Sequence, residues 1–277
     1  MSTITIHTDR EVFVHPFAAL EVPAGSLGIH WFEQNAFALK DAKGTILLID
    51  PYFPHERPAE RFLRPTPPVN EAELPTDYVL VTHRHGDHTN PETIRRIQAA
   101  WPDAVYVGPQ EAIAQILDET PVDDDHAIVI AASESVSLGD ITVQAFHSKP
   151  PEGDPGAGIK PPDVTHLGYV ITVGGVTVYV TGDAINTLAE HDDLLEPIAE
   201  LRPDIGLITT HPTEGEFPFF EGAVKLANKL GLKAAVPAHY ACFTKRTYDP
   251  QEFVAQFTGD GAQPLIIPWN THIVYPL

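Results

Sequence analysis

The sequence has only one cysteine, few basic residues and no long apolar run. With Cys242 alone, no intrachain disulfide can form, which favours a reducing compartment. No stretch reaches the roughly 18 consecutive apolar residues of a membrane-spanning helix, because Gly174 and Gly175 interrupt the most apolar segment, 169–180. Residues 1–10 lack the basic and apolar regions of a secretory signal. We therefore expect a cytoplasmic protein that does not act in a membrane.

The scarcity of basic residues also bears on partners. Lys and Arg number 17 against 38 Asp and Glu, which gives a formal net charge of −21. A surface of this sign repels the phosphate backbone instead of releasing its counterions. The charge excludes nucleic acid as an expected partner and favours a small-molecule substrate.

The composition predicts a folded chain. Of its 277 residues, 43% are hydrophobic and 20% are charged, close to globular averages, so a sizeable core is feasible. We expect one domain over residues 1–277. Two blocks emerge along the chain, each of strands followed by helices, and this order predicts an α/β fold of the four-layer α/β/β/α sandwich type.

In the first block, segment 29–39 reads as one strand, and a turn at 41–44 leads to a second strand at 45–50. Seven prolines between residues 51 and 76 exclude regular helix interiors and central strands, so we expect a long connecting loop there. Segment 78–82 reads as a buried strand.

The strongest signal for chemistry follows this strand immediately. Among the fourteen histidines, three cluster with a carboxylate in the string His83-Arg84-His85-Gly86-Asp87-His88. Strand ends are where α/β proteins place their sites. His83 and His85 can converge on one ion from an extended segment, while Asp87 and His88 can turn to a second ion after Gly86. Imidazole and carboxylate ligands suit Zn, Mn or Fe, so the string predicts a metal site.

This string resembles the His-x-His-x-Asp-His motif of the metallo-β-lactamase superfamily. Segments 45–51, 178–183 and 235–240 resemble the strand that precedes the motif, the bridging aspartate and the final histidine of that superfamily. Segments 22–26, 67–71 and 82–91 resemble more narrowly its ascorbate-6-phosphate lactonase-like branch. The resemblance implies the metallo-β-lactamase fold and a metal-dependent hydrolase.

The resemblance also implies a ligand set for two divalent transition-metal ions. The first ion would take His83, His85 and a histidine from the middle of the chain. The second would take Asp87, His88 and His239, and Asp183 would bridge the two ions; we assign Asp87 and Asp183 as catalytic too. The mid-chain ligand is either His147 or His166. We favour His147, because a strand end fixes a ligand better than a loop rich in Gly and Pro does.

Several other side chains carry open alternatives. Asp50 either supports the ligand histidines or begins a turn, and His211 either lines the pocket or only packs. Cys242 reads as an ordinary buried thiol. Lys245 and Arg246 either form a solvated face or hold an anionic group of the substrate.

Two ions that share a water lower its pKa toward neutrality and polarise the scissile oxygen. The sequence therefore predicts hydrolysis of a small, cyclic ester such as a lactone by metal-bound hydroxide, the lactone being implied by the resemblance alone. The alternatives are a phosphodiesterase that uses the same ions and a non-catalytic metal-binding protein of the same fold. No Gly-x-Ser-x-Gly elbow supports a serine hydrolase.

Overall fold

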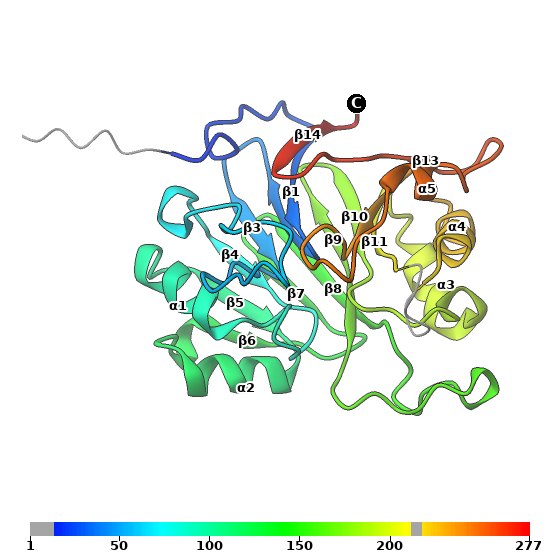
Figure 1. The fold of residues 1–277 in the computed structure, drawn as a ribbon, viewed down its shortest axis with the longest axis horizontal. Helices are drawn as coiled ribbons and strands as arrows, with labels where there is room; N and C mark the ends of the chain where they lie inside the picture. Colours follow the sequence, from blue (N-terminus) through cyan, green and yellow to red (C-terminus); the bar gives the residue numbers. More distant parts are fainter. Residues whose placement is uncertain (1–13, 212–217) are drawn as a thin grey trace, which may run out of the picture.

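The structure is a computed structural model that describes residues 14–211 and 218–277. Two mixed sheets face each other at the centre of the molecule, and helices cover the outer face of each sheet (Figure 1). This is the four-layer α/β/β/α sandwich that the order of strands and helices predicts and that the resemblance to the metallo-β-lactamase superfamily implies.

The first sheet has the strand order β14-β1-β2-β3-β4-β5-β6. This sheet is mixed. Strands β2 and β3 are antiparallel, whereas β3, β4 and β5 run parallel to one another. The strands are β1 (Leu27–Glu33), β2 (Ala36–Lys40), β3 (Ile46–Ile49), β4 (Tyr78–Leu80), β5 (Val105–Gly108), β6 (Ala127–Val129) and β14 (Thr271–Tyr275).

The second sheet has the order β13-β12-β11-β10-β9-β8-β7. The pairs β7–β8, β8–β9 and β9–β10 are antiparallel, whereas the pairs β10–β11, β11–β12 and β12–β13 are parallel. The strands are β7 (Ser135–Leu138), β8 (Ile141–His147), β9 (Leu167–Val173), β10 (Val176–Val180), β11 (Ile205–Thr209), β12 (Ala234–Ala238) and β13 (Gln263–Pro264).

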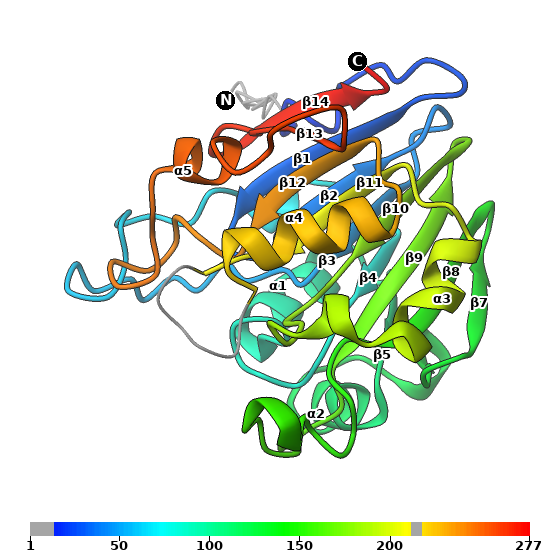
Figure 2. The same ribbon diagram turned by 90° about the vertical axis from the view of Figure 1, so that its right-hand side faces the viewer.

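Helices α1 and α2 cover the first sheet, and α3, α4 and α5 lie on the side of the second sheet (Figures 1 and 2). Their bounds are α1 (Pro91–Ala100), α2 (Gln110–Glu119), α3 (Asp192–Glu200), α4 (Phe220–Lys229) and α5 (Pro250–Val254). Short 3-10 turns occur at η1 (Glu71–Glu73), η2 (Asp124–His126), η3 (Pro155–Ala157) and η4 (Leu188–Glu190). No helix within the described ranges is both long and apolar enough to cross a membrane.

The alternation of side chains along each strand builds the separate layers of the core. In β3, Leu47 and Ile49 pack between the two sheets, whereas Ile46 and Leu48 pack against the helices. All four are buried, because a central strand of a sandwich has no solvent face. Burying one such side chain fully contributes about 1.5–3 kcal/mol.

The predicted strand 29–39 is wrong as a single element. The chain reverses at Gln34 and Asn35, and β1 and β2 pair with each other in antiparallel register. Gln34 takes a left-handed backbone conformation with φ of 53°, which a continuous strand does not contain. The polar triplet Glu33-Gln34-Asn35 between two apolar runs was the sequence signal for this reversal.

Candidate metal centre

The candidate ligands come from both sheets and converge at one edge of the sandwich. His83, His85, Asp87 and His88 follow β4 of the first sheet. In the second sheet, His166 precedes β9, Asp183 follows β10, and His239 follows β12. Leu167 N donates to Thr82 O over 3.0 Å, so the start of β9 is bonded directly to the segment that begins the histidine motif.

The segment from His83 to His88 is held by local hydrogen bonds. His88 N and Thr89 N both donate to His85 O, at 2.9 and 2.8 Å. Thr89 Oγ1 donates to His83 O over 2.7 Å. Helix α1 begins directly afterwards, where Asn90 accepts from Thr93 N and Pro91 occupies the first turn. The two ends of the motif are therefore fixed by the end of β4 and the start of α1.

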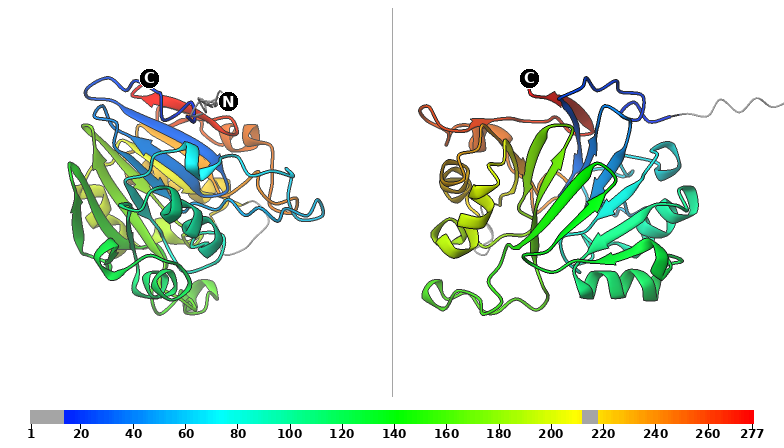
Figure 3. Two further views of the ribbon diagram at one scale, coloured as in Figure 1. Left: turned by 90° about the vertical axis from the view of Figure 1, so that its left-hand side faces the viewer. Right: turned by 180° about the vertical axis from the view of Figure 1, so that it is seen from behind.

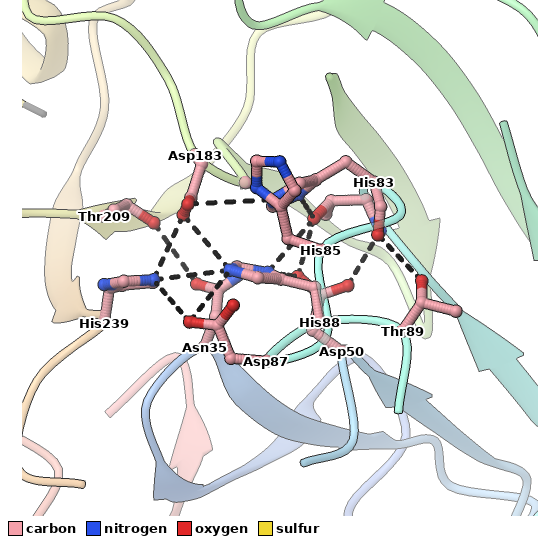
Figure 4. A network of polar contacts seen from close by, with 12 residues as sticks. Asn35, Asp50, His83, His85, Asp87, His88, Thr89, Asp183, Thr209 and His239 are labelled. Carbon is pink, nitrogen blue, oxygen red and sulfur yellow. Dashed lines mark hydrogen bonds and ion pairs between the residues drawn. The ribbon is translucent and has the colours of Figure 1, made fainter. Parts of the chain in front are cut away.

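Three overlapping groups of possible ligand atoms result, and within each group all atoms lie within 4.8 Å of one another. The groups are His83–His85–His166, His83–His88–Asp183 and Asp87–His88–His239. Figure 4 shows most of these side chains pointing toward a common centre.

Asp183 lies between the group His83–His85–His166 and the group Asp87–His88–His239. Its Oδ2 is 3.7 Å from His83 Nε2, and its Oδ1 is 3.4 Å from both His88 Nε2 and His239 Nε2 (Figure 4). One carboxylate oxygen thus faces each set. This arrangement suits a carboxylate that bridges two cations.

Gly182 allows the chain to place Asp183 there. Its φ is +55°, and a Cβ atom at this position would lie 2.7 Å from Leu167 O and 2.9 Å from Thr82 Cβ. A residue with a side chain would therefore push β10 away from the segments that carry His83 and His166.

Asp50 supports the ligands from beneath, as one of the two alternatives for this residue predicts. Its carboxylate accepts from Thr82 N and Thr82 Oγ1, both at 2.7 Å, and from Asn35 Nδ2 at 2.6 Å. His88 Nδ1 lies 2.7 Å from Asp50 Oδ2 and donates to it. This bond fixes a proton on Nδ1 of His88, so that Nε2 is the ring nitrogen directed at the centre.

The ionisation of the cluster is strongly perturbed. Burial, together with neighbouring His88 and His166, holds the pKa of His83 well below its usual value. Burial lowers the pKa of His166 to about 3. Burial alone would raise the pKa of Asp183, yet neighbouring His239 and His88 hold it well below its usual range. His83 and His166 are therefore neutral imidazoles beside the carboxylate of Asp183, which are the protonation states that bind a divalent ion.

The same electrostatics act on His88. Burial by itself would lower its pKa, but Asp183, Asp50 and Asp87 raise it well above its usual value. Three carboxylates around one imidazole thus hold a positive charge at this place. A divalent cation would satisfy the same carboxylates.

The structure does not bring His147 into any of the three groups, and it brings His166 there instead. The rings of His166 and His83 stack with their centroids 4.0 Å apart. His147 pairs with Leu167 in the β8–β9 register, and its half-buried ring lines a small separate cavity with Lys149 and one side of His166. In an antiparallel pair, the end of one strand and the start of the next lie at the same sheet edge, so the strand-end argument could not separate the two histidines.

Gln34 and Asn35 also reach the centre, although the sequence analysis did not single them out. Gln34 Nε2 donates to Asp87 Oδ2 over 2.8 Å and lies 2.9 Å from His239 Nε2. Asn35 bonds Asp50, and its Oδ1 accepts from Thr209 Oγ1 at 3.3 Å. The turn between β1 and β2 thus connects ligands from both sheets.

Three of these positions hold unusual backbone conformations. Gln34, Asp50 and His239 have φ angles of 53°, 43° and 67°. Left-handed conformations of residues other than Gly cost about 1–3 kcal/mol each and concentrate at functional sites. Their concentration around one centre indicates that side-chain placement here outweighs local backbone preference.

The remaining predicted candidates lie close to the centre or just outside it. Cys242 is fully buried, Glu33 lies 3.6 Å from its Sγ, and burial raises the pKa of the thiol, as expected for an ordinary buried cysteine. His211 is buried after β11 and belongs to none of the three groups. Arg246 Nη1 lies 3.7 Å from Asp87 Oδ2, and Lys245 is exposed beside it.

The donor set itself fits metal ions. Neither Nδ1 nor Nε2 of buried His166 has a hydrogen-bond partner within the described ranges. Leaving a buried polar atom unpaired costs about 1–3 kcal/mol, and coordination would remove that cost. His83 Nε2 and His85 Nδ1 face each other at 3.1 Å, and so do the Nε2 atoms of His88 and His239 at 3.3 Å. Imidazole lone pairs that converge in this way are typical of cation ligands.

Comparison with known proteins agrees with this geometry. Residues 45–240 match the model of the beta-lactamase superfamily domain, a range that contains all three ligand groups. The chain belongs to this superfamily. Its relatives include UPF0173 metal-dependent hydrolases of Oenococcus oeni, 30% identical over 85% of this chain and 96% of the relative, and of Archaeoglobus fulgidus, 29% identical over 81% and 88%. Superfamily membership makes a metal-dependent hydrolase the function to test.

Comparison with a solved structure supports the architecture. Igni18, a metallo hydrolase from Ignicoccus hospitalis, superposes with a TM-score of 0.62 over 91% of this chain and 99% of that one. Sequence identity is 19%, so this likeness bears on the fold alone.

Proposed function

We propose that this protein is a hydrolase that uses two divalent transition-metal ions, Zn, Mn or Fe, to cleave a small, cyclic ester such as a lactone. The observation that carries the proposal is the convergence of three overlapping ligand groups around Asp183, each with ligand atoms within 4.8 Å. The proposed ligands are His83, His85, His166, Asp87, His88, His239 and Asp183.

When bound, two such ions would lower the pKa of a water molecule and polarise the scissile carbonyl. The protein's own residues place and hold this chemistry. Asp183 separates the two ligand sets, Asp50 orients His88, and Gln34 holds Asp87 beside His239. Because Asp50 and Gln34 are buried and hydrogen-bonded to His88 and Asp87, these two ligands are oriented before a substrate arrives.

The choice of a lactone rests on the resemblance of segments 22–26, 67–71 and 82–91 to the ascorbate-6-phosphate lactonase-like branch. The net charge of −21 supports a small substrate in place of a nucleic acid, and a cytoplasmic location accords with the single buried cysteine. Ester hydrolysis needs attack on a planar carbonyl carbon, whereas phosphodiester cleavage needs in-line displacement. A substrate panel distinguishes the two reactions.

Elemental analysis of protein reconstituted with Zn, Mn or Fe tests the metal directly. We expect two equivalents per chain in the wild type and a marked loss in Asp183→Ala, since this carboxylate faces both ligand sets. Asp118→Ala, on the exposed side of α2, removes the same charge far from the centre and should keep full metal content. Only trace metal in the wild type would refute the proposal.

Turnover by the metal-loaded and metal-stripped protein tests the reaction. We expect metal-dependent hydrolysis of lactones by the wild type and by Asp118→Ala, and none by Asp183→Ala with its circular dichroism unchanged. If metal-dependent turnover is confined to phosphodiesters, the proposed substrate is a phosphodiester and not a lactone. No turnover of any ester by a fully loaded protein would favour a non-catalytic metal-binding role.

A further inference from the structure

A cavity of about 450 Å³ lies directly beside the candidate metal centre. It is lined by Asp87 and by residues 60–61 and 243–246. Asp87 also belongs to a ligand group with His88 and His239, so one wall of the cavity is part of the centre itself. The volume is within the range of small-molecule sites, about 300–1,000 Å³.

Two segments that are far apart in the sequence build this cavity. One is the proline-rich loop, residues 51–76, and the other is the loop that follows β12, residues 239–249. Leu63 N donates to Cys242 O, and Thr244 N donates to Arg61 O, both at 2.9 Å. Phe62 and Phe243 form an antiparallel bridge between these bonds. Figure 2 shows the two loops side by side at the left of the molecule. The walls of the cavity are thus joined by backbone hydrogen bonds.

Three basic side chains line the cavity, Arg61, Lys245 and Arg246. The whole chain has only 17 Lys and Arg against 38 Asp and Glu, so a concentration of positive charge is unexpected on this surface. Neither Arg61 nor Lys245 forms an ion pair with any residue in the described ranges. The acidic residues of the lining are Glu60 and Asp87, and Asp87 is also a candidate metal ligand.

A buried aromatic ring orients the two guanidinium groups. Arg61 and Arg246 lie over the ring of Phe243 at 5.1 and 6.0 Å from its centroid. Phe243 itself packs against Phe62 and Tyr52, with ring centroids 5.3 and 5.8 Å away. Stacking on a fixed ring reduces the freedom that an arginine loses on binding an anion.

Arg246 connects the cavity to the metal centre. Its Nη1 lies 3.7 Å from Asp87 Oδ2, which in turn accepts from Gln34 Nε2. An anionic group held by Arg246 and its two basic neighbours would therefore lie one side chain away from the ligands. This spacing suits a substrate whose charged group and reacting bond belong to one small molecule.

We infer that the cavity binds an anionic substituent of the substrate, a carboxylate or a phosphate, through Arg61, Lys245 and Arg246. The inference rests on the proposed hydrolase function and names its substrate class, small esters that bear one negatively charged group away from the scissile bond. Guanidinium and ammonium groups recognise both kinds of anion by charge-assisted hydrogen bonds. A basic cavity also offsets the repulsion that an anion meets at a protein of charge −21.

The kinetic test uses two esters that differ only in a carboxylate replaced by its neutral amide. The preference of the enzyme is the kcat/KM for the anionic ester divided by the kcat/KM for the neutral ester. The double variant Arg61→Gln/Lys245→Gln should lower this preference by about 10- to 100-fold, mainly because KM for the anionic ester rises. Arg95→Gln/Lys225→Gln makes the same change of charge on the exposed faces of α1 and α4 and should leave the preference unchanged. If the basic residues only stabilise the two loops, both esters lose activity equally, and the inference is wrong.

A binding test separates this inference from the proposed function. Calorimetry can measure the binding of inorganic phosphate to the metal-loaded wild type and to the same variants. This measurement requires no turnover. We expect the Arg61→Gln/Lys245→Gln variant to bind phosphate at least about tenfold more weakly than the wild type and the control. Equal phosphate affinity in all three proteins overturns the cavity assignment, even if esters are hydrolysed. A selective loss of phosphate binding supports it, even if every tested ester is inert.

Discussion

At the scale of single residues, His166 is a buried imidazole at the place where the imidazoles of His83 and His85 converge. Both ring nitrogens are buried and unbonded within the described ranges, and the ring stacks on His83 at 4.0 Å. His147, by contrast, is half-buried and has its ring outside the ligand groups. His147 pairs with Leu167, the neighbour of His166, yet of these two histidines only His166 belongs to a ligand group in the structure.

Substituting each of these histidines by alanine should therefore affect metal binding unequally. We expect His166→Ala to weaken the metal at His83 and His85 by more than the roughly 10–100-fold typical of supporting residues. His147→Ala should change the affinity little. Competition with a chromophoric chelator measures both dissociation constants. A larger loss in His147→Ala would restore the sequence-based choice of His147.

The contrast between these residues shows which part of the site a sequence can predict. One strand end carries the four candidate ligands His83, His85, Asp87 and His88 close together in the chain. Their pattern can therefore be recognised without a structure. His166 depends on the hydrogen bond from Leu167 N to Thr82 O, between segments about 85 residues apart. Such a contact is set by sheet register and leaves no local pattern in the chain.

At the scale of elements, the end of β1 and the proline-rich loop are joined by a buried ion pair. Arg57 Nη1 lies 2.6 Å from Glu33 Oε1, and neither side chain is exposed. Arg64 approaches the same carboxylate at 3.9 Å and donates to Ala241 O over 2.6 Å. Glu33 thus holds the proline-rich loop to β1 and, through Arg64, to the loop after His239.

The substitution Arg57→Met should destabilise the fold, because it leaves the Glu33 charge buried without its main partner. We expect a loss of about 3–5 kcal/mol in the free energy of unfolding, measured by urea denaturation. The double variant Glu33→Gln/Arg57→Met removes both charges and should recover part of this loss. If the double variant loses as much free energy of unfolding as Glu33→Gln and Arg57→Met lose together as single variants, the pair does not act as a unit.

The boundaries of the elements in this part of the chain were only partly predictable. The strand after the 41–44 turn and the loop at 51–76 follow from apolar runs and prolines, and the structure has both. The reversal at Gln34 and Asn35 is stabilised instead by distant partners, Asp87, Asp50 and Thr209. Tertiary contacts of this kind override the local preference of an otherwise strand-like segment.

At the scale of the whole molecule, the candidate ligands divide between the two sheets. The motif after β4 belongs to the first sheet, whereas His166, Asp183 and His239 belong to the second, and the right-hand view of Figure 3 shows the two sheets as separate layers. A cation held by both sets would connect the halves of the sandwich. Without it, the buried carboxylates and imidazoles must be accommodated by each other alone.

Removal of metal should therefore lower the stability of the entire domain. A ligand present at 100 times its Kd stabilises the folded state by about 2.7 kcal/mol, which for a chain of this size corresponds to a change in Tm of about 5 °C. We expect a strong chelator to lower the Tm of the reconstituted wild type by this amount, as measured by calorimetry, and readdition of metal to restore it. Asp183→Ala, which lacks the carboxylate facing both ligand sets, should respond much less to the chelator. An equal Tm for the loaded and the stripped wild type would mean that metal does not connect the two sheets.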